Sequence, residues 1–271
     1  MSPRPVNTER LLAREQELIE TALSIMEQEG TAGLTMDKVV ARVPYSKGTV
    51  YNHFCSREDL LTGICNAGME TLAELFSRAV MFQGTTRERL LAIHYAYLLH
   101  ALLDPIKFML VISAKTASLI ERTSERRLTA LYELEGRLMG PMFELVNEAI
   151  AGGELTLSPH MSRRQIVFTN WAGSFGAIAL LISSKDKCSG RDGLDTQTEV
   201  FNHANLLLDG MQWRPLTPEW DYASTLDRII SEIFPRESAL IGKLKQEARC
   251  GVTNPDLETE NHASQTSIPG Q

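Results

Sequence analysis

The sequence LTMDKVVARVPYSKGTVYNHFCSREDLL, residues 34–61, predicts two very short helices joined by a tight turn and followed at once by a third. Thr35 is a typical helix N-cap, and Asp37 places negative charge in the first turn, where the helix dipole favours it. Pro44 must end this first short helix, which we place at 36–43, because proline has no amide hydrogen and clashes with the preceding turn.

The segment after the turn predicts the second and third helices. Ser46 is a second N-cap, and the apolar residues Val50 and Phe54 follow it at helical spacing. Ser56, with Asp59 three residues later, caps the third and longer helix. Two short helices separated by a turn, the second presenting polar side chains, have the shape of a helix-turn-helix.

The run SKGTVYNHFCSREDLL resembles the N-terminal DNA-binding domain of TetR-family transcriptional regulators. The resemblance covers roughly residues 9–64, and it departs from the family at Pro44, where glycine is common. It implies an all-α fold, with an N-terminal three-helix helix-turn-helix domain and a C-terminal helical domain for ligand binding and dimerisation. It also implies a sequence-specific transcriptional regulator, a repressor released from a palindromic operator in double-stranded DNA by a small-molecule effector.

Within this resemblance, a recognition helix beginning at Ser46 would lie in the major groove. Lysine can donate to guanine and a threonine methyl can touch thymine, so we expect Lys47, Thr49 and Tyr45 to meet base edges. The helix N-termini at Thr35 and Arg57 favour contacts with backbone phosphates. The alternative for each position is a solvated helix face. The expected DNA-binding residues are Thr35, Tyr45, Ser46, Lys47, Thr49, Tyr51, Asn52, His53 and Arg57.

Composition is that of an ordinary globular protein, with 43% hydrophobic and 23% charged residues among 271. A net charge of −7 and a pI near 5.5 argue against wholesale coating of nucleic acid. Between residues 35 and 57, however, four basic side chains stand against Asp37 alone, which gives the local positive charge that sequence-specific DNA binding needs.

Four scattered cysteines without a CxxC pair argue against zinc or a disulfide framework, and we expect no metal, no cofactor and a reducing cytoplasm. No apolar signal segment stands at the N-terminus. Cys55 lies beside the DNA-reading segment, where it admits a redox switch or, more commonly, an ordinary free thiol.

We divide the chain into a flexible arm (1–8), the helix-turn-helix domain (9–64, its last helix continuing to about 83), an effector-binding and dimerisation domain (65–250) and a disordered tail (251–271). The first helix should span 9–29 and close at Gly30, and Pro141 should kink a later one. The helices expected in the second domain cover 87–103, 106–122, 124–151, 166–184, 196–213, 219–234 and 237–249.

Aromatic and methionine side chains in these helices are typical either of the wall of an effector pocket or of an ordinary bundle core. The pocket candidates are Tyr95, His100, Phe108, Met109, Tyr132, Met139, Phe143 and Trp171.

Residues 166–184 carry no charge over 19 residues, which suits either a membrane span or a helix buried in a subunit interface. Their polar side chains and glycines favour the interface, and the resemblance implies a homodimer formed by this helix and 196–213 as a four-helix bundle, without membrane insertion. The expected interface residues are Gly173, Gly176, Ala177, Leu180, Phe201, Ala204 and Leu208.

Two other functions compete with the ligand-responsive regulator. One is a helical small-molecule enzyme, which we do not expect because no nucleophile–base pair, phosphate loop or metal spacing is present in the sequence. The other is a DNA-bound organiser that ignores ligands.

Overall fold

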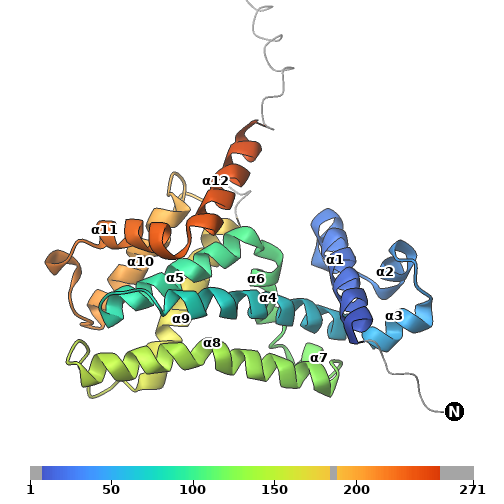
Figure 1. Ribbon diagram of the computed structural model, residues 1–271, viewed down its shortest axis with the longest axis horizontal. Coiled ribbons are helices and arrows are strands. Elements are labelled where there is room, and N and C mark those ends of the chain that lie inside the picture. Colours follow the sequence, from blue (N-terminus) through green and yellow to red (C-terminus); the bar gives the residue numbers. More distant parts are fainter. Residues whose placement is uncertain (1–7, 184–187, 251–271) are drawn as a thin grey trace, which may run out of the picture.

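The computed structural model describes residues 8–183 and 188–250, and every regular element within these ranges is helical. Figure 1 shows α1–α3 as a compact unit at one end, joined by α4 to a larger bundle. The all-α class expected from the sequence is confirmed, while the expected arm, except Thr8, and the expected tail lie outside the described residues. The helices are α1 (Thr8–Gly33), α2 (Met36–Arg42), α3 (Lys47–His53), α4 (Arg57–Ala79), α5 (Thr86–Leu103), α6 (Pro105–Ser113), α7 (Ala117–Ile120), α8 (Glu125–Ala151), α9 (Arg163–Ile182), α10 (Thr196–Gly210), the 3₁₀ turn η1 (Thr217–Glu219), α11 (Tyr222–Arg228), the π turn η2 (Ile229–Ile233) and α12 (Pro235–Cys250).

Three side-chain caps fix the short helices at the N-terminal end. The hydroxyl of Thr35 accepts from the amide of Lys38 at 3.3 Å, and that of Ser46 accepts from Thr49 at 3.2 Å. Ser56 begins α4 in the same way, which confirms all three caps.

The first helix breaks at Gly30, as expected, although its assigned range continues past the break. Gly30 takes a φ of 74°, which interrupts the helix there, but the chain resumes helical geometry and α1 reaches Gly33. Its inner face carries Leu18 and Ala22, both fully buried, whereas Leu11 is exposed.

The larger bundle is built around α4 and α5. The α4 helix packs most extensively against α8 and α5, and most side chains of α5 are buried. At Asp104 the chain turns by 106° into α6, whose first turn Asp104 caps through the amide of Lys107. The single helix expected over 106–122 is therefore wrong, because α6 ends at Ser113. Beyond that end, the Thr116 hydroxyl donates to the Ser113 carbonyl.

The chain after α10 also departs from expectation. α10 ends at Gly210, and Trp213 enters the core, where its indole nitrogen donates to Thr86 Oγ1 at 2.9 Å. Beside it the fully buried guanidinium of Arg87 bonds to Asp209 and to the Trp213 carbonyl, each at 2.7 Å. The buried charge is compensated, so this network fixes α10 against α5.

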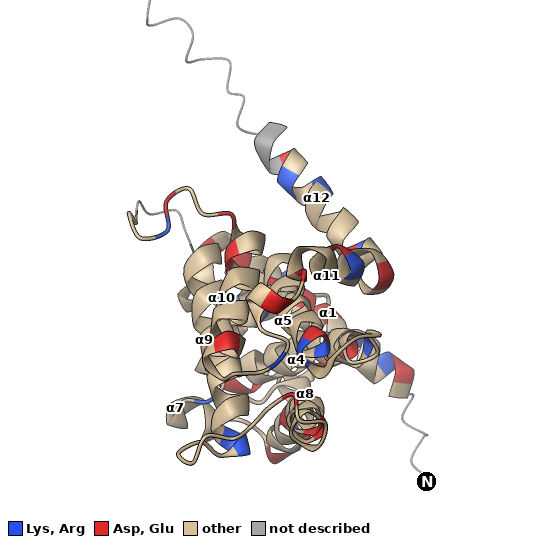
Figure 2. Ribbon diagram, turned by 90° about the vertical axis from the view of Figure 1, so that its left-hand side faces the viewer, with Lys and Arg blue, Asp and Glu red and all other residues tan. Residues whose placement is uncertain are grey.

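The expected helix over 219–234 is found over residues 222–233, where α11 passes directly into η2. The turn η1 precedes it, and α12 follows as the separate last helix that was expected. The α12 helix is held to the bundle by Arg78, which pairs with Glu237 at 2.6 Å, and by Tyr95, whose hydroxyl meets Ser238 Oγ at 3.0 Å. Figure 2 shows α12 extending away from the bundle, and it shows both acidic and basic positions along the ribbon at the end of the molecule remote from α3.

One described helix, α9, is long and apolar enough to cross a membrane, and α5 with α6 would qualify only as one sharply bent span. In this structure α9 packs against α10, α8 and α5, and it buries the polar side chains of Asn170 and Ser174. These contacts are those of a helix in a folded bundle.

Candidate nucleic-acid interface and ligand pocket

The helix α3, which the sequence predicts to be the recognition helix, is fixed from beneath by Val50 and Phe54, both fully buried. Lys47 projects from its first turn with 62% of its side chain exposed, pairs with Asp37 of α2 at 2.9 Å and lies 5.6 Å over the Tyr51 ring. The hydrogen bond to Asp37 raises the pKa of Lys47, so its positive charge is retained at neutral pH. The outer face of α3 is thus a polar surface with an exposed cation at its N-terminal end.

Four further residues of the expected DNA surface lie on or near this face. Asn52 and Tyr51 are exposed, and the hydroxyls of Thr49 and Ser46 lie 2.9 Å apart. Lys47, Tyr51 and Asn52 are thus open to a ligand outside the domain, whereas Ser46, although exposed, also caps α3.

Other expected DNA contacts are engaged inside the protein. Arg57 donates to the carbonyls of Leu34 at 2.8 Å and Thr31 at 2.7 Å, so it ties α4 to the α1–α2 connection. The Tyr45 hydroxyl donates to Glu17 of α1. His53 is largely covered, with its ring 3.9 Å from a Glu15 oxygen, and Thr35 serves as the α2 cap. In these positions the side chains hold α1, α2, α3 and the start of α4 together.

The N-terminal end of α8 contacts α1, α3 and the start of α4 through four side chains. We call this group the α8 clamp: Arg127 and Ser124 with their partners Glu15 and Asp59. Arg127 donates to Glu15 at 2.9 Å and to the carbonyl of His53, the last residue of α3, at 3.0 Å. Ser124 donates from both its amide and its hydroxyl to Asp59, at 3.0 and 2.7 Å.

Packing and electrostatics both stabilise the clamp. The Arg127 guanidinium lies 4.1 Å over the Phe54 ring, and a Cβ at Gly63 would come within 3.0 Å of the guanidinium, so the glycine is needed for close approach. Burial raises the pKa of Asp59, but the bonds from Ser124, the bond from the Cys55 amide and the charge of Arg127 together hold that pKa below its usual value. Burial also raises the pKa of Glu15, but the hydrogen bonds and charges of Arg127 and Arg126 outweigh it, so the pKa is lowered. Both carboxylates are therefore charged at neutral pH.

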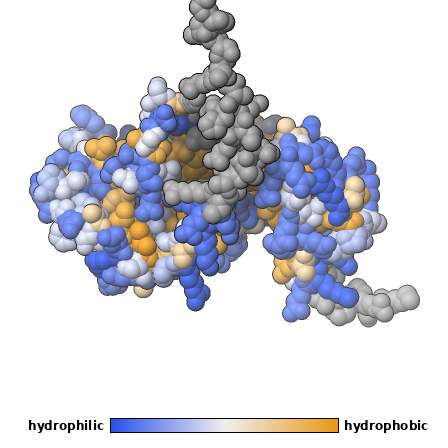
Figure 3. Space-filling model, turned by 90° about the horizontal axis from the view of Figure 1, so that it is seen from above, coloured by the Kyte–Doolittle hydropathy of each residue, from blue (hydrophilic) through white to orange (hydrophobic). Residues whose placement is uncertain are grey.

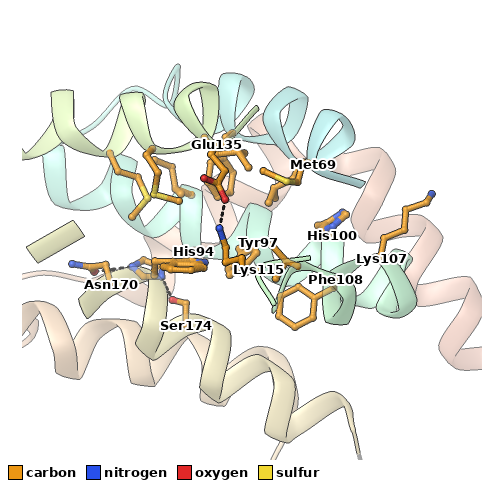
Figure 4. Close-up of a pocket in the computed structure, with 18 residues that line it drawn as sticks. Met69, His94, Tyr97, His100, Lys107, Phe108, Lys115, Glu135, Asn170 and Ser174 are labelled. Atoms are coloured by element: carbon orange, nitrogen blue, oxygen red, sulfur yellow. Dashed lines mark hydrogen bonds and ion pairs between the residues drawn. The ribbon is translucent and has the colours of Figure 1, made fainter. Parts of the chain in front are cut away.

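A cavity of about 180 Å³ lies between α4, α5, α6, α8 and α9. Its wall is mainly apolar, and Figure 4 shows the side chains converging on it from these helices. Four of the expected pocket residues line it: His100, Phe108, Met139 and Trp171. The other four lie elsewhere: Tyr95 faces α12, Met109 and Tyr132 are exposed, and Phe143 is half-buried outside the lining.

Polar groups occupy two sides of the cavity (Figure 4). On one side Lys115 forms an ion pair with Glu135 of α8. On the other, the ring of His94 bonds through Nδ1 to Ser174 and through Nε2 to Asn170 Oδ1, the latter at 3.1 Å. Burial lowers the pKa of His94 to about 4 and that of His100 to about 4, so both rings are neutral at pH 7.

The helices expected to form the dimer interface pack first on each other within the chain. A Cβ at Gly173 would lie 2.7 Å from Leu207 of α10, so that glycine serves the contact between α9 and α10. A Cβ at Gly176 would meet no atom within 4 Å, and Leu180 is 67% exposed. The remaining expected interface residues are half-buried Ala177 and the buried Phe201, Ala204 and Leu208.

Residues 18–64 match the family described as bacterial regulatory proteins, tetR family. The N-terminal part of the chain is a TetR-family DNA-binding domain. No curated protein matches the sequence of the chain.

Several solved structures share the fold of this chain over most of their own length. A Rhodococcus sp. RHA1 protein of unknown function is 22% identical with a TM-score of 0.59, over 73% of this chain and 95% of that one. The TetR-family regulator PfmR of Thermus thermophilus is 16% identical with a TM-score of 0.53, over 71% and 97%. FadR of Bacillus subtilis, solved with stearoyl-CoA, is 14% identical with a TM-score of 0.55, over 72% and 98%. At these identities the likeness concerns the fold, which extends through the helices beyond α4.

Several residues of these sites were missed by sequence reasoning. The clamp was missed entirely, because Arg127 reads as one of several charges on an amphipathic helix. In the cavity, Lys115 and Glu135 were missed as well, since an exposed-looking charge gives no sign of facing an apolar space. Cys55 is exposed, but the partial loss of solvent around its thiol and the charge of Asp59 raise its pKa, which favours the protonated thiol and weakens the redox-switch interpretation.

Proposed function

We propose that this TetR-family chain is a homodimeric repressor that leaves a palindromic operator when a small molecule enters the cavity beside α8. The observation that carries the proposal is that one helix, α8, supplies both a wall of the cavity and the clamp on the recognition helix. The binding domain would be 9–64, with the effector and dimerisation functions in 65–250.

DNA contact is assigned to the open face of α3. Lys47 would meet guanine or phosphate at the start of the helix, Thr49 would meet a base edge, and Tyr51 and Asn52 would reach the backbone. Tyr45, His53 and Arg57 would act indirectly, because Tyr45 and His53 contact acidic side chains of α1 and Arg57 ties α4 to the α1–α2 connection.

Coupling would run along α8. Met139 in the cavity and Arg127 in the clamp are separated by 12 residues, or about 18 Å of helix at 1.5 Å per residue. A ligand that displaces Glu135 and Met139 outward would shift α8 as a rigid body and carry Arg127 away from the His53 carbonyl. Couplings of this kind are typically about 1–3 kcal/mol, or roughly 5- to 150-fold in affinity.

Dimerisation would use the outer faces of α9 and α10. These faces expose Phe168, Leu180 and Leu206, and Gly176 leaves room for a second helix. Figure 3 shows, from above, that hydrophobic patches interrupt the hydrophilic surface of the larger lobe. A two-fold dimer would place two α3 helices on half-sites about 34–36 Å apart.

Selection from random DNA followed by footprinting tests the DNA-binding part of the proposal. We expect paired half-sites protected together, and loss of affinity in Lys47→Ala. Arg137→Ala serves as the matched control, because Arg137 is an exposed cation of α8 that pairs with Glu70, away from α3. Equal affinity for a lone half-site would refute the two-fold arrangement.

The ligand-responsive part has its own test, which separates it from a ligand-independent organiser. A true effector must bind the free dimer more tightly than the operator-bound dimer, by the same factor by which it weakens DNA binding. Calorimetry of a candidate ligand on both forms measures this factor. Equal affinities for every compound that occupies the cavity would favour the organiser.

A further inference from the structure

The charged groups around the cavity already have partners. Lys115 is paired with Glu135, and Lys107 is paired with Asp104 at 2.5 Å. A charged ligand would have to break one of these pairs, or bring an uncompensated charge into a largely apolar space. Both events carry a desolvation cost that a neutral ligand avoids.

The polar residues of the His94 side are satisfied as well. Both ring nitrogens of His94 are engaged, one with Ser174 and one with Asn170, and the Asn170 amide group donates to the Ile166 carbonyl at 2.9 Å. This trio is a closed network that fixes α9 against α5 and has no free ring nitrogen to offer a ligand.

His100 differs from the other polar side chains in one respect. It is only 4% exposed and lines the cavity, yet its ring makes no hydrogen bond to any residue in the described part of the chain. The charged groups that act on it are Asp104 and Lys107, which oppose each other, and burial keeps the ring neutral. Figure 4 shows the ring beside Phe108 and Met69, at the end of the cavity away from His94.

A neutral imidazole carries one N–H donor and one acceptor nitrogen, and neither nitrogen of His100 is among the fully covered polar atoms that lack a partner, so both remain accessible. Water or a ligand that enters the cavity can satisfy them. The apolar body of such a ligand would lie against Phe108, Met139 and Trp171, which line the same space.

We propose that the cavity takes an uncharged, mainly apolar small molecule whose single carbonyl or hydroxyl oxygen hydrogen-bonds to His100. This inference rests on the proposed effector function of the same cavity and specifies its ligand class. Carboxylates and amines of the same size are excluded from this class because Lys115 and Glu135 neutralise each other.

Four eight-carbon probes test the proposal on the full-length protein: octan-2-one, oct-1-ene, octanoate and octylammonium. We expect octan-2-one to bind more tightly than the other three in calorimetry. His100→Leu should weaken octan-2-one binding about 2- to 13-fold, which corresponds to one net neutral hydrogen bond. It should leave oct-1-ene binding unchanged.

His203→Leu is the matched control, because His203 also has a buried ring nitrogen without a partner but lies outside the cavity lining. It should not change octan-2-one binding. If His100→Leu does not fold, the carbonyl stretch of bound, isotope-labelled octan-2-one in the unaltered protein supplies the second measurement. A band at the hydrocarbon-solvent frequency would overturn the proposal, and a shift to lower frequency would support it.

Tighter binding of octanoate or octylammonium, or no binding by any probe, would overturn the ligand class. Operator release is measured separately. Octan-2-one that binds without releasing operator DNA would contradict the proposed function and leave this inference standing. Octanoate that binds best and releases the DNA would do the reverse.

Discussion

Replacement of Arg127 by methionine tests the clamp most directly. The Arg127 side chain is 6% exposed and donates to Glu15 and the His53 carbonyl at 2.9 and 3.0 Å, with Asp59 at 3.5 Å. Methionine keeps most of the apolar volume but leaves Asp59 without its cation and Glu15 with the exposed Arg126 alone. Removing one partner of a buried pair costs about 3–5 kcal/mol, so we expect the free energy of unfolding to fall by that amount.

The neighbouring Arg126 provides a control that shares the same acceptor. It pairs with Glu15 at 3.2 Å, but its side chain is 68% exposed. Exposed pairs contribute about 0–1 kcal/mol, so Arg126→Met should change stability by less than about 1 kcal/mol. Urea unfolding at one fixed protein concentration compares the two variants, since dimer stability depends on concentration. Equal losses in the two variants would refute the clamp.

Three further predictions concern acid, packing and assembly. Because the folded pKa values of His94 and His100 are about 4 against 6.5 unfolded, their stabilising contribution is complete above pH 6.5 and is lost as the pH falls toward 4. Each should cost about 2 kcal/mol between pH 6.5 and about pH 5 at 1.36 kcal/mol per pH unit, and a flat unfolding profile over that range would contradict neutral burial. Gly63→Ala should destabilise by about 1–3 kcal/mol in thermal or urea unfolding, because its Cβ would lie 2.7 Å from the Phe54 ring, whereas Gly136→Ala, with open space around it, should be neutral or stabilising. Gly176→Arg should leave the fold intact, because nothing lies within 4 Å, and should shift sedimentation from dimer to monomer; an undiminished dimer would argue against the outer face of α9.

The parts of the structure that depend on local chemistry could be predicted from the sequence. Each of the caps at Thr35, Ser46 and Ser56 joins residues three apart in the chain, so the starts of α2, α3 and α4 could be predicted from the sequence. Trp213 was not, because its burial depends on Thr86, which is 127 residues away. A residue that ends a helix and enters the core gives the same local pattern as one that continues the helix.

The faces of the helices explain the mixed outcome for the pocket. Tyr95 and His100 are five positions apart on α5, which places them about 140° apart around the helix at 3.6 residues per turn. Tyr95 faces Ser238 of α12 and His100 faces the cavity. Since α5 is apolar nearly all round, its periodicity does not show which face meets the cavity. The sequence likewise does not show which acceptor Arg57 meets. Its charge suggests a phosphate, whereas its N–H groups donate to two backbone carbonyls.

The α8 clamp has a consequence for exchanging parts between relatives. Residues 9–64 look like a self-contained cassette, but they include Asp59 and Glu15, whose partners Ser124 and Arg127 lie far outside it. A chimera that joins this cassette to another regulator's body would leave both carboxylates to whatever that body presents. We therefore expect functional transplants to need the loop before α8 and its first turn, so the portable specificity unit is discontinuous in the chain.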